Sequence, residues 1–172
     1  NFCGVMGGPV QSEQGIVGGI FGGSKNNFSK CKKYLNCFCK SVFYFGDVSK
    51  ASSAKLLSNF LSLLTTTSVI EFFKSAKKLD INIKLLCDVA RLGSGNSGAL
   101  DRIANKAIKG NYKGYVFSVD NTFKDLDYIN DLVSDMPNAN NLVKIAKSFY
   151  KNASKKGFGN LLVSELIGKE KY

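Results

Sequence analysis

One stretch of the sequence, residues 45–77, decides the fold, and it reads FGDVSKASSAKLLSNFLSLLTTTSVIEFFKSAK. Apolar residues dominate it and no proline interrupts it, over a length well above that of an average helix. We therefore expect one long helix from about Ser49 to Lys77 or Lys78. Because apolar residues occupy most of its circumference, we expect other elements to bury this helix on several sides.

A narrow polar stripe runs along this otherwise apolar helix. Side chains four residues apart lie above one another on a helix, and five small or polar residues share one face in this way: Ser52, Lys55, Asn59, Ser62 and Thr66. The stripe contains one cation, Lys55, near the start of the helix. A helical lysine is most often a surface residue whose stem lies along apolar neighbours, so the stripe alone leaves a structural role open.

The bulk composition is that of a globular protein. The 172 residues fit one domain, or one domain and part of another, and 44% of them are hydrophobic. The net charge of +11 suits an anionic partner, yet only two of the 24 basic residues are arginine. Since arginine is the usual residue for gripping phosphate and guanine, we expect no nucleic-acid partner. A coding bias toward lysine and asparagine is the simpler explanation of the charge.

The five cysteines, Cys3, Cys31, Cys37, Cys39 and Cys87, occur in a chain without histidine. An odd number with irregular spacing argues against both a disulfide framework and a zinc site. We interpret them as buried thiols in a reducing compartment and expect no metal. The expected location is the cytoplasm, or the mitochondrial matrix if the protein is eukaryotic.

The apolar run between Ala51 and Phe73 is long enough to span a membrane. Lys55, Glu71 and the many hydroxyl side chains within it argue against this, so we expect no membrane partner. The chain begins at Asn1 rather than at methionine, and we expect it to be a fragment of a longer protein.

The first 47 residues differ from the rest in their pattern of glycine and apolar residues. Glycine doublets punctuate short apolar runs, which indicates strands; a helix is expected over residues 27–39 and a further strand over residues 42–45. A sheet this small has open edges and little core, so it would fit best as the extension of a larger sheet. We therefore divide the chain into residues 1–47 and residues 48–172.

After the long helix the sequence predicts only helices, so the fold class is mainly α. The spacing of apolar residues places the later helices at about residues 81–90, 100–108, 123–133, 142–153 and 161–167. Asp80 is the expected N-cap of the first of these. A loop rich in glycine and serine, residues 93–98, separates the first two.

Four motifs carry more specific information, and two of them lie in the first third of the chain. The first is CGVMGG at residues 3–8, followed by SEQG at residues 12–15. The second has the spacing G-x-x-G-x-G-x-x-x-K-x-x-x-N, and its positions are filled by Gly46, Ser49, Ala51, Lys55 and Asn59.

The other two motifs lie in the helical part. The third is the glycine and serine loop that ends in Ser97, and the fourth is Phe117 followed at seven residues by Lys124-Asp125-Leu126. In these motifs and their order, essentially the whole chain resembles the C-terminal half of the β-hydroxyacid dehydrogenases. This is the family of 3-hydroxyisobutyrate dehydrogenase and tartronate semialdehyde reductase.

The resemblance implies an all-helical C-terminal domain of the 6-phosphogluconate dehydrogenase type, with a long interdomain helix. The preceding strands would belong to a Rossmann domain that is otherwise missing, since no Gly-x-Gly-x-x-Gly unit is present. The implied function is the reversible oxidation of a small 3-hydroxy acid to its semialdehyde. NAD or NADP would be bound mainly by the missing domain, so this chain alone would be inactive. A homodimer or homotetramer is implied.

The resemblance also assigns roles to individual residues. Lys55 would be the general acid and base, Asn59 would orient the substrate, and Asp125 would position or tune the lysine. Lys124 would contact the cofactor. The substrate would be bound by Met6, Gly7, Gly8, Ser97 and Phe117.

Some positions depart from the family pattern. Met6 stands where the family has a substrate-binding serine, Gly4 replaces a proline, and Ser49 and Ala51 replace glycines. These departures leave a second hypothesis open, in which the chain is a catalytically degenerate member that binds or scaffolds. A basic helical module for nucleic acid is a third and weaker alternative.

Overall fold

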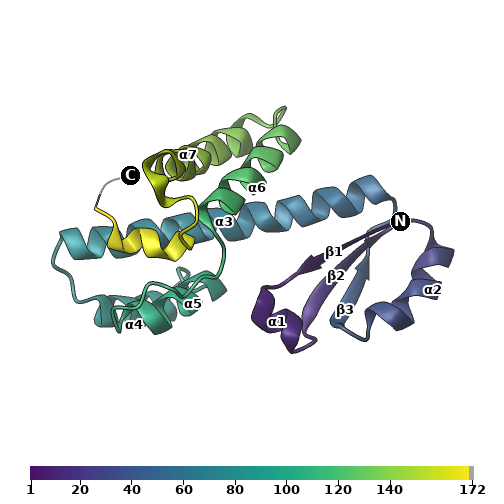
Figure 1. Cartoon of the computed structure of the whole chain (residues 1–172), viewed down its shortest axis with the longest axis horizontal. Helices are drawn as coiled ribbons and strands as arrows, with labels where there is room; N and C mark the ends of the chain where they lie inside the picture. The colour runs from purple at the N-terminus through teal and green to yellow at the C-terminus, as the bar shows by residue number, and fades with distance from the viewer. Residues whose placement is uncertain (171–172) are drawn as a thin grey trace. The chain divides into compact units, whose positions relative to one another are not determined.

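The computed structural model describes residues 1–170. Contacts divide the chain into two units, Asn1–Asn59 and a second that begins at Phe60. Helix α3 (Val48–Lys78) contributes its first turns to one unit and its remainder to the other. Strands occur only at the start of the described chain and helices make up most of the rest (Figure 1), so the predicted mainly helical fold is confirmed.

The first unit is built on a sheet of three strands in the order β1 (Phe2–Met6), β2 (Val17–Gly22) and β3 (Cys39–Tyr44). β1 and β2 are antiparallel and are joined through a short helix, α1 (Pro9–Glu13), which the sequence did not predict. β2 and β3 are parallel, and α2 (Lys25–Leu35) provides the crossover that parallel neighbours require.

Aromatic packing fixes α2 against the sheet. The helix begins after Ser24, whose hydroxyl accepts a hydrogen bond from the Asn27 N–H. One turn along, the Phe28 ring lies 5.4 Å from that of Phe21 in β2 and 5.1 Å from that of Tyr44 in β3. This cluster packs α2 onto β2 and β3.

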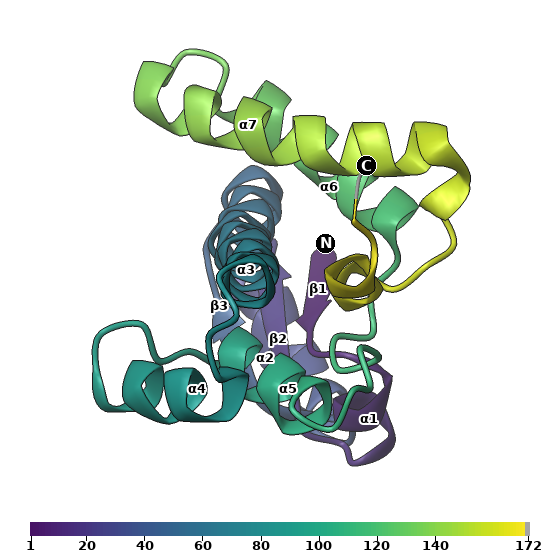
Figure 2. The same ribbon diagram turned by 90° about the vertical axis from the view of Figure 1, so that its left-hand side faces the viewer.

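The second unit contains the later part of α3 and the remaining helical segments. Their bounds are α4 Ile83–Leu92, α5 Gly98–Ala107, α6 Val119–Leu132, α7 Pro137–Ala153, η1 Ser154–Phe158 and the 3-10 helix η2 Val163–Gly168. α6 and α7 lie side by side (Figure 2). The predicted cap of α4 was wrong, because the Asn82 side chain accepts from Leu85 N–H while Asp80 has a left-handed backbone with φ 52°.

α3 is buried on one side in this unit. Leu63, Ile70 and Phe73 are almost fully buried at helical spacing, whereas Leu61 is 69% exposed. The expectation that neighbours bury this helix on several sides was therefore wrong. By length and composition α3 could cross a membrane, which is weak evidence because core helices of soluble proteins pass the same test.

The threonine and serine hydroxyls in the apolar part of α3 form hydrogen bonds to carbonyl groups of the same helix. Thr66 is fully buried, and its hydroxyl donates to the carbonyl of Ser62, four residues earlier. Thr65, Thr67 and Ser68 bond back to the chain in the same way. The polar atoms of this stretch are thus satisfied within the helix itself.

The cysteines differ from the expectation. All five are free thiols, but only Cys39 and Cys87 are buried, while Cys3 and Cys37 are exposed. Burial raises the pKa of the Cys87 thiol. Among residues 1–170, no group of three or more acidic, cysteine or histidine side chains could hold a metal ion.

Tyr150 joins α7 to α3 through a buried hydrogen bond. The ring is 1% exposed, and its hydroxyl lies 2.8 Å from that of Thr67. Because the Thr67 hydroxyl already donates to the Leu63 carbonyl, the tyrosine must be the donor. Burial raises the pKa of Tyr150 well above its ordinary value.

We expect Tyr150→Phe to lower the free energy of unfolding by about 1 kcal/mol at pH 7, the usual value of one buried hydrogen bond. Since the folded-state pKa of Tyr150 is raised, its stabilising contribution is complete below the unfolded-state pKa and is lost as pH rises above it. The deficit of the variant should therefore shrink above pH 10, as measured by urea denaturation. Tyr128→Phe, at a residue that is 56% exposed, is the control and should match the wild type.

Candidate functional site

The predicted site residues fall into two groups, one in each unit. The first unit holds Met6, Gly7, Gly8, Lys55 and Asn59, and the second holds Ser97, Phe117, Lys124 and Asp125.

The first group depends on how α3 begins. Gly46, with φ 86°, makes the turn that leaves β3. Asp47 then caps the helix: its Oδ1 atom accepts from the Lys50 N–H at 2.9 Å and from the Ser49 hydroxyl at 2.7 Å. These two hydrogen bonds, of which the one from the Lys50 N–H has the larger effect, hold the pKa of Asp47 below its ordinary value. Ser49, which departs from the family glycine, thus takes part in the cap.

The first turn of α3 lies directly against the end of β2. A Cβ atom added at Gly22 would come within 2.6 Å of the Ala51 Cβ, 2.7 Å of the Asp47 carbonyl oxygen and 2.9 Å of the Val48 Cα. Ala51 is completely buried. Position 51 therefore needs a small side chain, which explains why alanine can stand in for glycine there.

Lys55 lies one turn beyond this contact, and its stem crosses β1. A Cβ atom at Gly4 would be 3.0 Å from the Lys55 Cδ, so the missing side chain at Gly4 provides the room for the stem. Residues two apart in a strand point to the same face, which places Met6 on the face that Lys55 crosses. Lys55 is half-buried. The first unit thus brings the lysine to the strand that ends in Met6, one of the predicted substrate-binding residues.

Asn59 follows Lys55 by one helical turn and is also half-buried. The two side chains therefore share one face of α3, as the four-residue spacing predicts. A carboxamide there can both donate and accept hydrogen bonds, whereas the lysine ammonium only donates.

The glycine pair after β1 is already engaged within the chain. Gly7 has φ 144°, which favours glycine, and a Cβ there would meet Val17 at 2.9 Å. The Gly8 N–H donates to the Gln11 Oε1 at 3.0 Å. A substrate carboxylate could take this N–H only after the Gln11 side chain had moved. Sequence reasoning missed Gln11, although a glutamine three residues after a helix start is a capping signal.

In the second unit, Phe117 lies just before α6, and Lys124 and Asp125 lie in the second turn of this helix. The Phe117 carbonyl accepts from the Val163 N–H, and Ser118 caps the helix by accepting from the Asn121 N–H. The Lys124 ammonium lies 3.8 Å from the Asp125 carboxylate; the lysine side chain is 56% exposed and the aspartate 17%. Lys124 is therefore accessible to a ligand, while Asp125 is mostly enclosed.

Ser97 has a structural role that its motif did not reveal. It is the N-cap of α5, and its hydroxyl accepts from the Leu100 N–H at 3.1 Å. The glycine and serine loop that it ends is thereby fixed to the helix. A binding role for Ser97 would have to be additional to this capping role.

A family model described as NAD-binding of NADP-dependent 3-hydroxyisobutyrate dehydrogenase matches residues 49–168. This range includes the lysine, the asparagine and all the second-unit residues named above.

Two relatives are similar in sequence. The cytokine-like nuclear factor N-PAC of Anopheles gambiae is 23% identical over 91% of this chain and 27% of its own length. The probable mitochondrial 3-hydroxyisobutyrate dehydrogenase of Dictyostelium discoideum is 29% identical over 54% of this chain and 29% of its own length. The chain thus spans less than a third of either relative.

A solved structure is similar in fold. The crystal structure of 3-hydroxyisobutyrate dehydrogenase from Salmonella typhimurium has a TM-score of 0.83 and 24% identity, covering 96% of this chain and 58% of that chain.

We expect Gly22→Ala to destabilise the first unit by about 2 kcal/mol, because backbone atoms of α3 would have to move away from β2. Urea denaturation followed by circular dichroism measures this. Gly18→Ala in the same strand is the matched control, since its Cβ would meet Met6 at an ordinary 3.8 Å. Equal stability of the two variants would contradict the close contact between β2 and α3.

Proposed function

Because the chain belongs to the NADP-dependent 3-hydroxyisobutyrate dehydrogenase family, whose model covers residues 49–168, we propose that its protein reversibly oxidises a small 3-hydroxy acid to the semialdehyde. Lys55 is the general acid and base in this proposal, and Asn59 orients the substrate. The observation that supports it best is the passage of the Lys55 stem over Gly4, which brings this lysine to β1.

The chemistry requires one proton transfer from the protein. In the oxidation direction the substrate hydroxyl gives its proton to the Lys55 side-chain nitrogen as the C–H bond breaks, and in the reduction direction this nitrogen returns it. The bound dinucleotide supplies the hydride acceptor or donor. Asn59 can hold the reacting oxygen through its amide N–H or a hydroxyl through its carbonyl oxygen. Asp125 then acts as the group that positions or tunes the lysine.

Lys124 is the residue of this chain that we propose for contact with the dinucleotide. Its side chain is more than half exposed and its ammonium has a single carboxylate within 4 Å in the described chain, so it can reach a phosphate or ribose group. The substrate would be bound by Met6, Gly7, Gly8, Ser97 and Phe117. A location in a reducing compartment agrees with the free thiols.

The sheet of the first unit supports the presence of a larger nucleotide-binding domain in the complete protein. β3 is an edge strand of this sheet, and Phe43 within it is 58% exposed. On the opposite edge, Val5 in β1 is 46% exposed. Edges with apolar side chains are normally covered or extended. We therefore propose that this chain needs that domain for turnover.

An exposed apolar face on α4 supports a homodimer or homotetramer. Leu85, Val89 and Leu92 lie on one side of the helix and are 61%, 66% and 91% exposed. Lys84 and Asp88 form an ion pair at 3.9 Å beside them, so these two charges do not oppose contact with a second copy.

A catalytically degenerate scaffold remains the second candidate function. Met6 lacks the hydroxyl of the family serine, and one relative that matches most of the chain is named as a nuclear factor rather than a dehydrogenase. This alternative predicts that the protein turns over no semialdehyde, even when its dinucleotide-binding part is present.

The test of Lys55 uses a protein that carries this chain together with a dinucleotide-binding domain. We expect Lys55→Ala to lower kcat by about 100-fold or more, because a general acid and base contributes that much. The KM for the dinucleotide should stay within a few-fold. Steady-state kinetics on a panel of small semialdehydes measures both.

Lys50→Ala is the matched control for Lys55→Ala. Lys50 is exposed in the first turn of the same helix and engages Asp47 through its backbone N–H, which alanine keeps. Its kinetics should equal those of the wild type. If Lys55→Ala retains turnover within a few-fold on every substrate, the proposed role of Lys55 is wrong.

For Lys124, we expect replacement by alanine to raise the KM for the dinucleotide about tenfold while leaving the KM for the hydroxy acid unchanged. The physical reason is the loss of one charge-assisted contact to the cofactor. Dinucleotide titration at saturating hydroxy acid measures this. An unchanged KM for the dinucleotide would contradict the cofactor contact, and the Lys124–Asp125 ion pair would then be an ordinary surface pair.

A further inference from the structure

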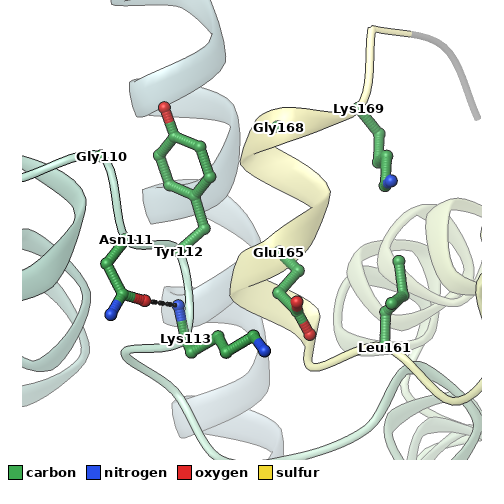
Figure 3. A pocket seen from close by; sticks show the side chains of 8 residues that line it. All are labelled: Gly110, Asn111, Tyr112, Lys113, Leu161, Glu165, Gly168 and Lys169. Atoms are coloured by element: carbon green, nitrogen blue, oxygen red, sulfur yellow. Dashed lines mark hydrogen bonds between the residues drawn. The ribbon is translucent and has the colours of Figure 1, made fainter.

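A hollow of about 590 Å³ lies in the second unit, and none of the predicted site residues lines it. One wall is the loop after α5, residues 110–113, and the other is Leu161 with the η2 residues Glu165 and Gly168 and the following Lys169 (Figure 3). The volume suits a small molecule rather than a polymer.

Hydrogen bonds hold the two walls at a fixed spacing. The buried Ser164 hydroxyl donates to the Tyr112 carbonyl at 2.6 Å and accepts from the Tyr115 N–H at 3.1 Å. A Cβ atom at Gly168 would lie 3.2 Å from the Tyr112 ring, so the ring packs closely on η2. The hollow is thus built into the fold and does not depend on a loose loop.

The loop itself is also shaped by hydrogen bonds. The Asn111 Oδ1 accepts from the Lys113 N–H at 2.9 Å (Figure 3). Lys106 donates through Nζ to the Lys113 carbonyl at 3.2 Å. Because the Asn111 carbonyl oxygen is used in this way, its amide N–H groups remain the donors that this side chain can offer to a ligand.

Positive charge collects around the hollow. Lys113 and Lys169 line it, and the Lys169 Nζ lies 5.2 Å from the centre of the Phe158 ring. The Lys77 Nζ lies 4.5 Å from the centre of the Tyr112 ring and forms a cation–π contact with it. With Lys106, four ammonium groups are associated with the two walls.

One carboxylate, that of Glu165, lines the same hollow. Its Oε2 accepts from the Leu162 N–H at 2.9 Å, which caps the start of η2. Within residues 1–170, no ion pair joins Glu165 to Lys113 or Lys169. The two lysines are therefore not paired with this carboxylate, and they outnumber it in the lining of the hollow.

We propose that this hollow is a binding site for a small phosphate-bearing metabolite. Lysine ammonium groups bind phosphate oxygens as point charges, and an amide N–H can complete the contacts. The site is independent of the dehydrogenase chemistry, because none of its residues belongs to the proposed catalytic or cofactor-binding set.

Pyrophosphate is the probe, and isothermal titration calorimetry on the full chain at low ionic strength measures its binding. We expect saturable binding with one site per chain. The double variant Lys113→Gln/Lys169→Gln should weaken pyrophosphate binding at least tenfold, because two charged contacts to phosphate are lost. No saturable binding to the wild type would overturn the proposal.

Lys151→Gln/Lys155→Gln is the matched control, since it removes the same charge from two exposed lysines at the end of α7 and in η1. Its affinity for pyrophosphate should stay within twofold of the wild type. If both double variants weaken pyrophosphate binding equally, the affinity depends on the net charge of the chain rather than on this hollow. That result would overturn the proposed site. A single-stranded DNA oligonucleotide that binds more tightly than pyrophosphate through Lys113 and Lys169 would also overturn it.

Glu165→Gln provides a test in the opposite direction. Glutamine can still accept the Leu162 N–H through its carbonyl oxygen, so the cap of η2 is kept. Removing the negative charge should strengthen pyrophosphate binding several-fold, since an anion no longer meets a carboxylate. A weaker affinity in this variant would contradict an anion site and would indicate that Glu165 itself contacts the ligand.

Discussion

The close contact between the start of α3 and the end of β2 is the constraint on which the first unit depends. Ala51 is completely buried against Gly22, and a single added carbon atom would not fit between them. This contact fixes where the long helix leaves the sheet, and the next turn then brings Lys55 across Gly4. The small residues Gly4, Gly22 and Ala51 thus determine where the long cationic side chain of Lys55 lies.

Much of this architecture follows from the sequence, because apolar spacing is a local signal. The helices of the second unit appear where their apolar residues recur, and the start of α3 at Val48 lies within a residue of the predicted one. The finer details depend on competition between neighbours. Asp80 and Asn82 are both good caps, and only the backbone of the complete fold decides in favour of Asn82.

The site residues come from the sequence and stay predictions, whereas several of their contacts could be seen only in the structure. The motif could not show that Gln11 already occupies the N–H of Gly8, or that Ser97 caps α5. Both contacts are formed within a few residues, so a capping analysis could have found them. The cysteines were misjudged for another reason: composition suggests burial on average, whereas exposure depends on which strand face and helix face each one occupies.

The buried tyrosine of α7 has a practical consequence, because the chain contains no tryptophan and seven tyrosines. The absorption and fluorescence of the protein in the near ultraviolet therefore come mainly from its tyrosine rings. Tyr150 is enclosed in the helical core and donates to Thr67, whereas Tyr34 and Tyr128 face solvent. The Tyr150 ring can therefore serve as a built-in spectroscopic reporter of core packing. Quenchers should reach it last, and its absorption should change when the helices separate.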